Sequence, residues 1–217
     1  MKRFILFSMP SPKVMEKITD LMFPKEWGKI VFGYMPSDGT SEKNQEYIPF
    51  WKTITEKCGA EFTFINNSLN SEEERKKVNA CNSLVITGGN TYTLLNNLKR
   101  NGFDNSLKDF VKKDNFVLSA FSAGAIAISP TIKIVKEEWA FGPDTNLVGL
   151  KDLTGINLID FEILPHYTAG ADDALLEKYR LKSHYTVNAV SDDGYIIVEL
   201  KNKKWVFYTV TTGFEIT

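Results

Sequence analysis

The chain has 217 residues, 43% hydrophobic and 24% charged, which suits one domain spanning residues 1–217 with a sizeable buried core. Its 26 basic and 27 acidic residues give a formal net charge of -1, so no overall field favours nucleic acid or an anionic membrane. The apolar run Phe4 to Phe7 is too short for a signal peptide, and no stretch approaches the ~18 apolar residues of a membrane span. We therefore expect a soluble cytoplasmic protein that acts on a small molecule, with no nucleic-acid or membrane partner.

The cysteine content indicates a reducing compartment. Cys58 and Cys81 fall at the ends of predicted helices, and their spacing is not that of a metal site. We interpret both as small buried residues, and we expect no disulfide framework and no metal.

Short apolar runs alternate with amphipathic stretches along the chain. The apolar runs predict buried strands at residues 3–7, 29–35, 61–65, 84–87 and 116–120. Helical spacing predicts helices at residues 11–23, before Lys57, from 71 to about 80, from 91 to Gly102, around 107–111 and at 123–128. Ser41 is available as a helix cap, and Pro49 should kink or restart the helix that ends at Lys57.

The last third of the chain has a different pattern. Strand-like runs occur at residues 131–135, 161–165 and 186–190. Residues 194–200 and 205–210 form two further runs joined by a tight polar link, which predicts an antiparallel hairpin. Because apolar strands alternate with helices elsewhere, we expect an α/β fold, a three-layer α/β/α arrangement with a mostly parallel central sheet and this hairpin at its edge.

Residues 120–124 have the pattern of a nucleophile elbow around Ser122. Such an elbow needs small residues two before and two after the serine, and Ala120 and Gly124 meet that need. The turn joins a predicted strand to a predicted helix, so the hydroxyl would emerge at the carboxyl end of the sheet. An ordinary small-residue turn would show the same pattern, so the elbow needs partners.

A serine nucleophile requires a base, normally histidine, and the chain has two histidines. His166 follows the strand-like run 161–165, which places it at a strand end as expected for a base. His184 follows a charged helical stretch and is interpreted as a surface residue. His166 is therefore the predicted base.

A carboxylate should orient this histidine and stabilise its charged form. Glu137 and Glu138 lie between Ser122 and His166 in the chain, whereas Asp192 and Asp193 follow the strand-like run 186–190. The residues alone leave all four open.

The turn Gly88-Gly89-Asn90-Thr91 follows another predicted strand. Its glycines let backbone N–H groups face outward, so it could supply one oxyanion donor beside the N–H of Ala123. Gly88, Asn90 and Thr91 could bind substrate. The same turn could instead cradle phosphate. It lacks the Lys-Ser/Thr of a P-loop and the third glycine of a dinucleotide fingerprint.

Several motifs together resemble the peptidase E (aspartyl dipeptidase) and cyanophycinase family of serine peptidases. They are Ile86-Thr87-Gly88-Gly89-Asn90-Thr91, Phe121-Ser122-Ala123-Gly124-Ala125, Ser129-Pro130-Thr131-Ile132 and Leu164-Pro165-His166-Tyr167. Their order and spacing cover about residues 84–167, with weaker similarity at both ends.

The resemblance implies a fold like that of class I glutamine amidotransferases, with serine in place of cysteine in the elbow. It implies cofactor-free hydrolysis of a peptide bond near an amino terminus, with Ser122 as nucleophile and His166 as base. Gly89 and Ala123 would form the oxyanion hole. Glu137 falls where the family places its acidic member when residues are counted without gaps. Relatives are monomers or dimers, so a homodimer is compatible with the resemblance.

The stretch after His166 departs from the aspartyl dipeptidases, which carry arginine there for an aspartyl side chain. Here that stretch contains Asp172 and Asp173, and its first arginine is Arg180. An acidic loop would repel an aspartyl group, so strict aspartyl specificity is not expected. Two alternatives stay open, an esterase or amidase with the same site and a non-catalytic binding module that retains the fold.

Overall fold

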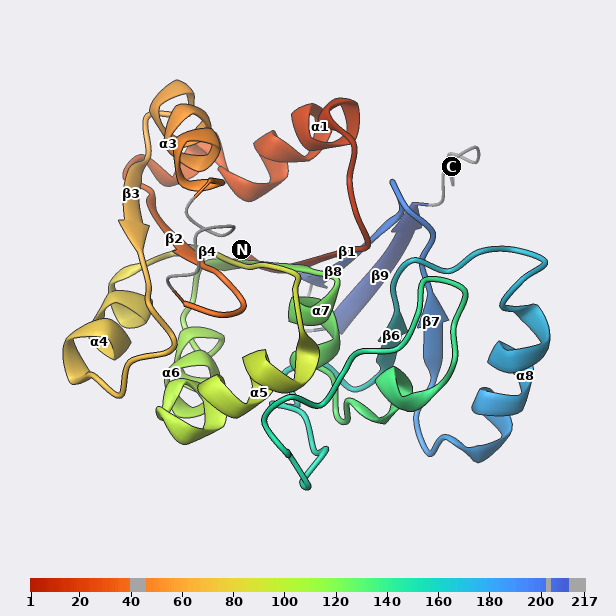
Figure 1. Cartoon of the computed structure of the whole chain (residues 1–217). Coiled ribbons are helices and arrows are strands. Elements are labelled where there is room, and N and C mark those ends of the chain that lie inside the picture. Colours follow the sequence, from red (N-terminus) through yellow and green to blue (C-terminus); the bar gives the residue numbers. More distant parts are fainter. Residues whose placement is uncertain (40–45, 202–203, 211–217) are drawn as a thin grey trace.

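A seven-stranded sheet forms the centre of the computed structural model, which describes residues 1–39, 46–201 and 204–210 (Figure 1). The strand order is β3-β2-β4-β5-β1-β8-β9. Its strands are β1 (Lys2–Phe7), β2 (Val31–Met35), β3 (Glu61–Phe64), β4 (Ser83–Ile86), β5 (Phe116–Phe121), β8 (Tyr195–Lys201) and β9 (Lys204–Val210).

The first five strands in sequence pair in parallel, and the last two are antiparallel. The predicted hairpin is thus confirmed, with β8 pairing β1 and β9 at the edge, although residues 202–203 of its link lie outside the described residues. Two further strands, β6 (Glu162–Leu164) and β7 (Val187–Ala189), form a separate parallel pair.

Helices cover both faces of the sheet (Figure 1). The helices are α1 (Pro12–Met22), α3 (Ile48–Lys57), α4 (Glu72–Ala80), α5 (Thr91–Arg100), α6 (Phe103–Phe110), α7 (Ala123–Ala127) and α8 (Asp173–Lys182), with short 3-10 turns η1 (Lys25–Trp27) and η2 (Lys133–Lys136). One hydrophobic core cluster packs α1 and α3 against one face of the sheet. A second cluster packs α4, α5, α6 and α7 against the opposite face. This arrangement confirms the expected three-layer α/β/α class.

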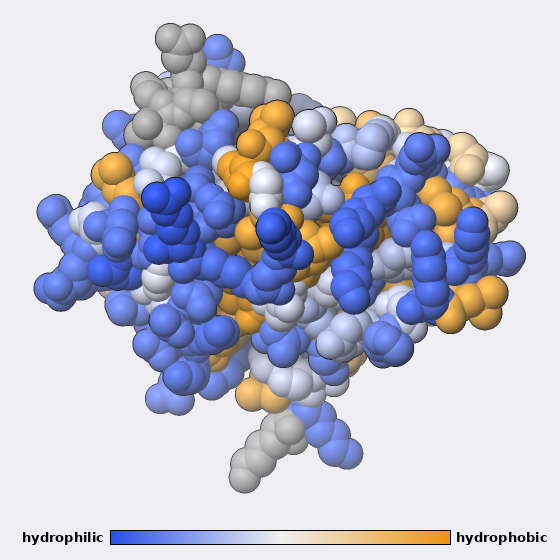
Figure 2. Space-filling view, turned by 60° about the horizontal axis from the view of Figure 1, so that its bottom comes forward, coloured by the Kyte–Doolittle hydropathy of each residue, from blue (hydrophilic) through white to orange (hydrophobic). Residues whose placement is uncertain are grey.

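Side-chain burial explains why these runs form strands. Ile5, Leu6 and Phe7 of β1 are fully buried, as expected for a central strand covered on both faces. From the side shown in Figure 2, hydrophilic residues cover most of the surface, with hydrophobic residues gathered between them. No helix among the described residues is long and apolar enough to cross a membrane.

The run at residues 131–135 is not a strand, and that prediction was wrong. Thr131 makes one isolated antiparallel bridge to Thr154, and the chain then turns into η2. Ile134 and Val135 are buried in the core that covers the sheet rather than in the sheet itself, so burial of a β-branched run produced the misleading pattern. Pro49 lies in the first turn of α3, where proline is tolerated, and Ser41 lies outside the described residues.

Candidate functional site

Three polar turns meet at the carboxyl ends of the parallel strands. Ser8 follows β1, residues 87–89 follow β4 and Ser122 follows β5, and parallel strands bring these carboxyl ends together. Because β8 runs antiparallel to β1, its first residue pairs with the last residue of β1. The segment that enters β8, including Asp192, therefore reaches the same end of the sheet.

Ser122 lies in a sharp turn between β5 and α7. Its φ of 45° and ψ of -113° are unusual for a residue with a side chain and cost on the order of 1–3 kcal/mol. Its N–H donates to the Phe7 carbonyl (3.0 Å), and its carbonyl accepts from the Ile126 N–H (3.0 Å). A Cβ on Gly124 would lie 2.5 Å from the Ile86 carbonyl oxygen, so a larger residue would force the turn away from β4. The local packing therefore holds the serine in a nucleophile elbow.

His166 lies between Ser122 and a carboxylate. The Ser122 Oγ is 2.8 Å from Nε2 of His166, and Nδ1 of the same ring is 2.8 Å from Oδ1 of Asp192. An ionised carboxylate can only accept a hydrogen bond, so it favours the tautomer with the proton on Nδ1. Nε2 then has a free lone pair that can accept the serine proton.

Ser8 is a further member of this arrangement. Its buried hydroxyl donates to Oδ1 of Asp192 (2.7 Å), accepts from the backbone N–H of His166 (2.7 Å) and lies 3.3 Å from Nδ1. His166 has a positive φ of 58°, and the hydrogen bond from its N–H to the Ser8 hydroxyl holds the backbone in this conformation. Sequence reasoning missed Ser8, although a polar residue directly after a buried strand was a usable signal.

Among the four candidate carboxylates, the structure brings Asp192 to His166. The side chain of Glu137 pairs with Lys182 (2.7 Å) instead. Glu138 is exposed, and Asp193 accepts a hydrogen bond from the backbone N–H of Ser11. The expectation that Glu137 contacts the histidine therefore does not match the geometry, because Glu137 leaves η2 toward α8.

The glycine turn after β4 packs directly against Ser122. A Cβ on Gly88 would lie 3.1 Å from the Ser122 Cβ. Gly89 has a φ of 142° and lines the same cavity as Ser122. Ala123 is the first residue of α7, where a helix N–H has no intrahelical acceptor. The predicted oxyanion residues thus flank the serine from two sides.

The next residues of this turn begin α5 and hold a neighbouring loop. Asn90 is the helix cap, because its side chain accepts from the Thr93 N–H (2.9 Å), and it also donates to the Thr145 carbonyl (2.8 Å). The Thr91 N–H donates to Oδ2 of Asp144 (2.8 Å). Of the residues predicted to bind substrate, Thr91 lines the cavity beside Ser122, whereas Gly88 packs against Ser122 and the Asn90 side chain caps α5.

A cavity of about 170 Å³ opens beside the serine. Its lining residues are Gly89, Thr91, Ser122, Ile126, Val135, Phe141, Asp144 and His166. The Phe141 ring packs against the His166 imidazole, with centroids 5.1 Å apart, and so covers one side of the base. The cavity therefore combines the reactive groups with an apolar wall and one carboxylate.

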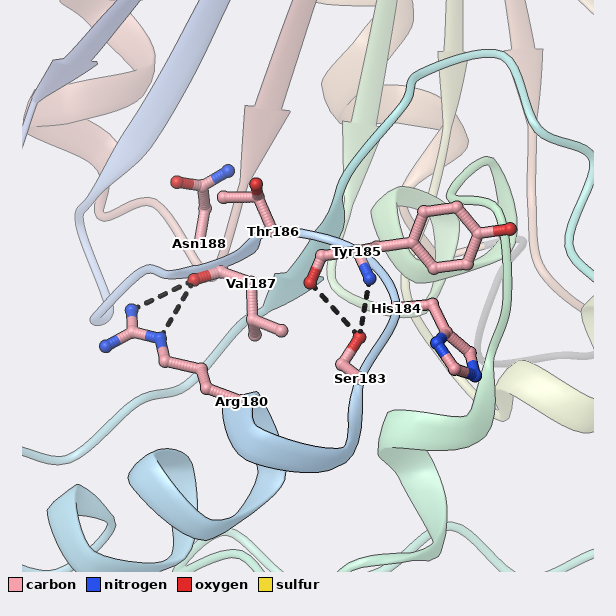
Figure 3. A pocket seen from close by; sticks show the side chains of 7 residues that line it. All are labelled: Arg180, Ser183, His184, Tyr185, Thr186, Val187 and Asn188. Carbon is pink, nitrogen blue, oxygen red and sulfur yellow. Dashed lines mark hydrogen bonds between the residues drawn. The ribbon is translucent and has the colours of Figure 1, made fainter.

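A larger hollow of about 500 Å³ lies between the end of α8 and β7 (Figure 3). It contains the exposed His184, but its polar groups serve the local backbone. Arg180 donates to the Val187 carbonyl (2.9 and 3.3 Å), and the Ser183 hydroxyl bonds the backbone of Tyr185. It shares no lining residue with the cavity beside Ser122, so we assign the chemistry to the smaller cavity.

The sheet carries a nucleophile elbow, and its serine, a histidine and an aspartate are in hydrogen-bond contact. This arrangement is that of a serine hydrolase of α/β fold. Within that class, the chain belongs to peptidase family S51, whose family model matches residues 11–212.

Sequence relatives agree with this family. Uncharacterized peptidase Lmo0363 of Listeria monocytogenes is 30% identical over 62% of this chain and 64% of its own length. Peptidase E of Nostoc sp. is 27% identical over 62% of this chain and 51% of its own length. The chain therefore matches less than two thirds of either relative.

Two solved structures show the same fold. A crystal structure of a Listeria monocytogenes EGD-e protein bearing the peptidase E name superposes with a TM-score of 0.71, at 24% identity, covering 97% of this chain and 100% of that one. A peptidase from an acI-B1 Actinobacterium gives a TM-score of 0.60 at 16% identity, covering 100% of this chain and 97% of its own. These likenesses support the fold over almost the whole chain.

Proposed function

We propose that the protein is a serine peptidase that hydrolyses short peptides through an acyl-enzyme. The observation that carries this proposal is the pair of 2.8 Å contacts that join Ser122 to His166 and His166 to Asp192 at the end of an elbow. Serine is inert at its own pKa, and these contacts supply both the base and the group that orients it.

In the first half of the reaction, the Ser122 Oγ attacks the carbonyl carbon of the scissile bond while its proton passes to Nε2 of His166. The carbonyl electron pair moves to oxygen, and the N–H groups of Gly89 and Ala123 stabilise that oxyanion. When the tetrahedral intermediate collapses, the C–N bond breaks and His166 gives its proton to the leaving amine. Asp192 stabilises the imidazolium between these two transfers.

In the second half, water attacks the acyl carbon and its proton passes to His166. Collapse breaks the bond between the acyl carbon and Oγ, and His166 returns the proton to Ser122. The reaction needs no redox cofactor and regenerates each of its groups.

Family membership supports a peptide as the substrate, since the matched family and the relatives are peptidases by name. The cavity of about 170 Å³ fits one residue side chain rather than a long segment, which supports short peptides. An ester or a non-peptide amide would use the same chemistry, so substrates must be compared directly.

The test is covalent labelling of the serine with a fluorophosphonate probe, followed by peptide mapping. We expect one label per chain on Ser122 and no label in Ser122→Ala. Turnover should then be compared on a panel of dipeptides and tripeptides beside simple aryl esters, and hydrolysis of the peptides is expected.

Ser119→Ala is the matched control, because Ser119 is a buried serine of β5, the strand that leads into Ser122, and its hydroxyl has no hydrogen-bond partner among the described residues. It should label like the wild type. Absence of labelling in a folded wild-type protein would contradict the proposal and favour the binding module.

A further inference from the structure

Among the described residues, the cavity beside Ser122 is lined by one carboxylate, that of Asp144, and by no lysine or arginine. Oδ2 of Asp144 accepts the Thr91 N–H at 2.8 Å, and no ion pair to Asp144 exists among residues 1–39, 46–201 and 204–210. The amino end of α5 favours a negative charge at this position. Within the described part of the chain, the Asp144 carboxylate therefore has lone pairs that accept no hydrogen bond, and no cation pairs with it.

The Asp144 carboxylate acts electrostatically on the neighbouring Tyr92. Burial raises the pKa of Tyr92, the next residue in α5 after Thr91, and the Asp144 carboxylate raises it further. A negative charge that acts on a neighbouring hydroxyl also acts on a ligand in the cavity that it lines.

One side of the cavity wall is apolar and is formed by Ile126, Val135 and Phe141. Ile126 and Val135 are almost completely buried, and Phe141 extends over the His166 ring. This wall offers contact to methylene groups but no hydrogen bond for a polar stem. A side chain with an apolar stem and a positively charged end satisfies both the wall and the carboxylate.

The acidic residues that follow His166 do not provide this charge. Asp172 is buried, and its carboxylate accepts the backbone N–H groups of Ala140 (2.8 Å) and Thr168 (2.7 Å). Asp173 accepts the hydroxyl of Tyr167. Both fasten loops, so Asp144 is the carboxylate that a ligand in this cavity would meet.

We propose that the cavity selects a basic residue, lysine or arginine, on the acyl side of the scissile bond. Its stem packs on Ile126, Val135 and Phe141, and its cationic end pairs with Asp144. This inference rests on the proposed peptidase function and adds the substrate class. It excludes an acidic residue at the same position, because a second negative charge would meet Asp144 without a cation between them.

The experiment compares three amino-blocked substrates that differ only in the acyl residue, lysine, norleucine or glutamate, with the same fluorogenic leaving group. We expect the wild type to prefer lysine over norleucine about 10- to 100-fold in kcat/KM, the range for a hydrogen bond to a charged group, and glutamate to be the poorest. In Asp144→Asn, the ratio of lysine to norleucine should fall toward one.

The ratio within one variant is insensitive to a general loss of active protein. Asp144→Ser, which removes the charge and keeps a polar side chain, is a second variant and should lose the preference in the same way. Asp160→Asn is the matched control, since Asp160 is exposed and does not line the cavity. It should keep the wild-type ratio.

A ligand can bring positive charge to Asp144 in its lysine side chain or in its free amino terminus. Comparing each substrate with a free and with an acetylated amino group separates these two sources. If Asp144→Asn removes only a requirement for the free amine, and lysine is no better than norleucine, then Asp144 binds the amino terminus and the assignment is overturned. If Ser122 labels and the substrates are cleaved without preference, this inference fails alone. If Ser122 does not label, the proposed function fails with it.

Discussion

Oδ1 of Asp192 lies between Nδ1 of His166 and the hydroxyl of Ser8, at 2.8 Å from the first and 2.7 Å from the second. The carboxylate is half exposed, with 52% of its side chain accessible, whereas the imidazole is 19% accessible. Ser8 therefore fixes the direction of a carboxylate that solvent would otherwise leave mobile, and the carboxylate fixes the ring.

Asp192→Asn should reduce kcat by about 10⁴, because an amide can donate to Nδ1 and so favour the wrong imidazole tautomer. Steady-state kinetics on the best peptide substrate measures the effect. Glu137→Gln is the control and should lose only the exposed pair with Lys182, with kcat unchanged. Full turnover in Asp192→Asn, or its loss in Glu137→Gln, would return the role to Glu137.

Ser8→Ala should lower kcat by about 10- to 100-fold, because it removes a hydrogen bond to a charged group and leaves the His166 N–H without its acceptor. A positioning role should also move the acid limb of the pH-rate profile, which a merely structural loss would not do. Ser8→Thr keeps the hydroxyl and should recover part of the rate. An unchanged profile and rate in Ser8→Ala would show that Asp192 needs no support.

Gly89→Ala should lower turnover by about 10²–10³, the cost of losing one oxyanion donor. Its φ of 142° disfavours a side chain, and the added Cβ would lie 2.1 Å from the Ser37 Oγ, so the turn must move. Gly59→Ala is matched, since Gly59 also has a positive φ of 64° but has nothing within 4 Å of the added atom. Gly59→Ala should lose stability but keep turnover, and equal turnover in both variants would contradict an oxyanion role.

The buried pair between Arg3 of β1 and Glu199 of β8 predicts a pH-dependent stability. Burial acts to raise the pKa of Glu199, but hydrogen bonds from Lys201 and Arg3 outweigh it, and the pKa lies below its ordinary value of 4.5. A lowered carboxyl pKa stabilises the fold above the ordinary pKa, and that stabilisation is lost as pH falls through the folded pKa.

Glu199→Gln should therefore cost about 2 kcal/mol in the free energy of unfolding at pH 7, and its deficit against the wild type should shrink below about pH 4.5. Urea unfolding at a series of pH values measures it. Glu26→Gln, at an exposed position, should match the wild type throughout. A deficit that stayed constant down to pH 3 would show that the charge of Glu199 contributes nothing.

The sequence predicted most of the fold because its central strands β1, β2, β4 and β5 are largely buried and its helices carry clear periodicity. The error at residues 131–135 arose because burial in the core that covers the sheet and burial within the sheet select the same β-branched residues. Periodicity indicates which residues are buried, but it does not indicate which elements they pack against.

The site was predictable where it depends on local sequence. The elbow at Ser122 and the glycine turn at Gly89 are defined by residues that are neighbours in the chain. The partners Ser8 and Asp192 depend on the antiparallel pairing of β8 with β1, which is a long-range contact. Strand order is not encoded in any single segment, so counting along the chain from the elbow led to Glu137.

The hydrogen-bond chain joins Ser8, which directly follows the first strand, to Asp192 in the last third of the 217 residues. A ribosome releases the amino-terminal part first, so Ser8, Ser122 and His166 are all synthesised before Asp192. Until residue 192 has emerged and β8 has paired with β1, nothing holds the imidazole in the productive tautomer. The proposed hydrogen-bond chain is therefore complete only after residue 192 has been synthesised, long after the elbow at Ser122.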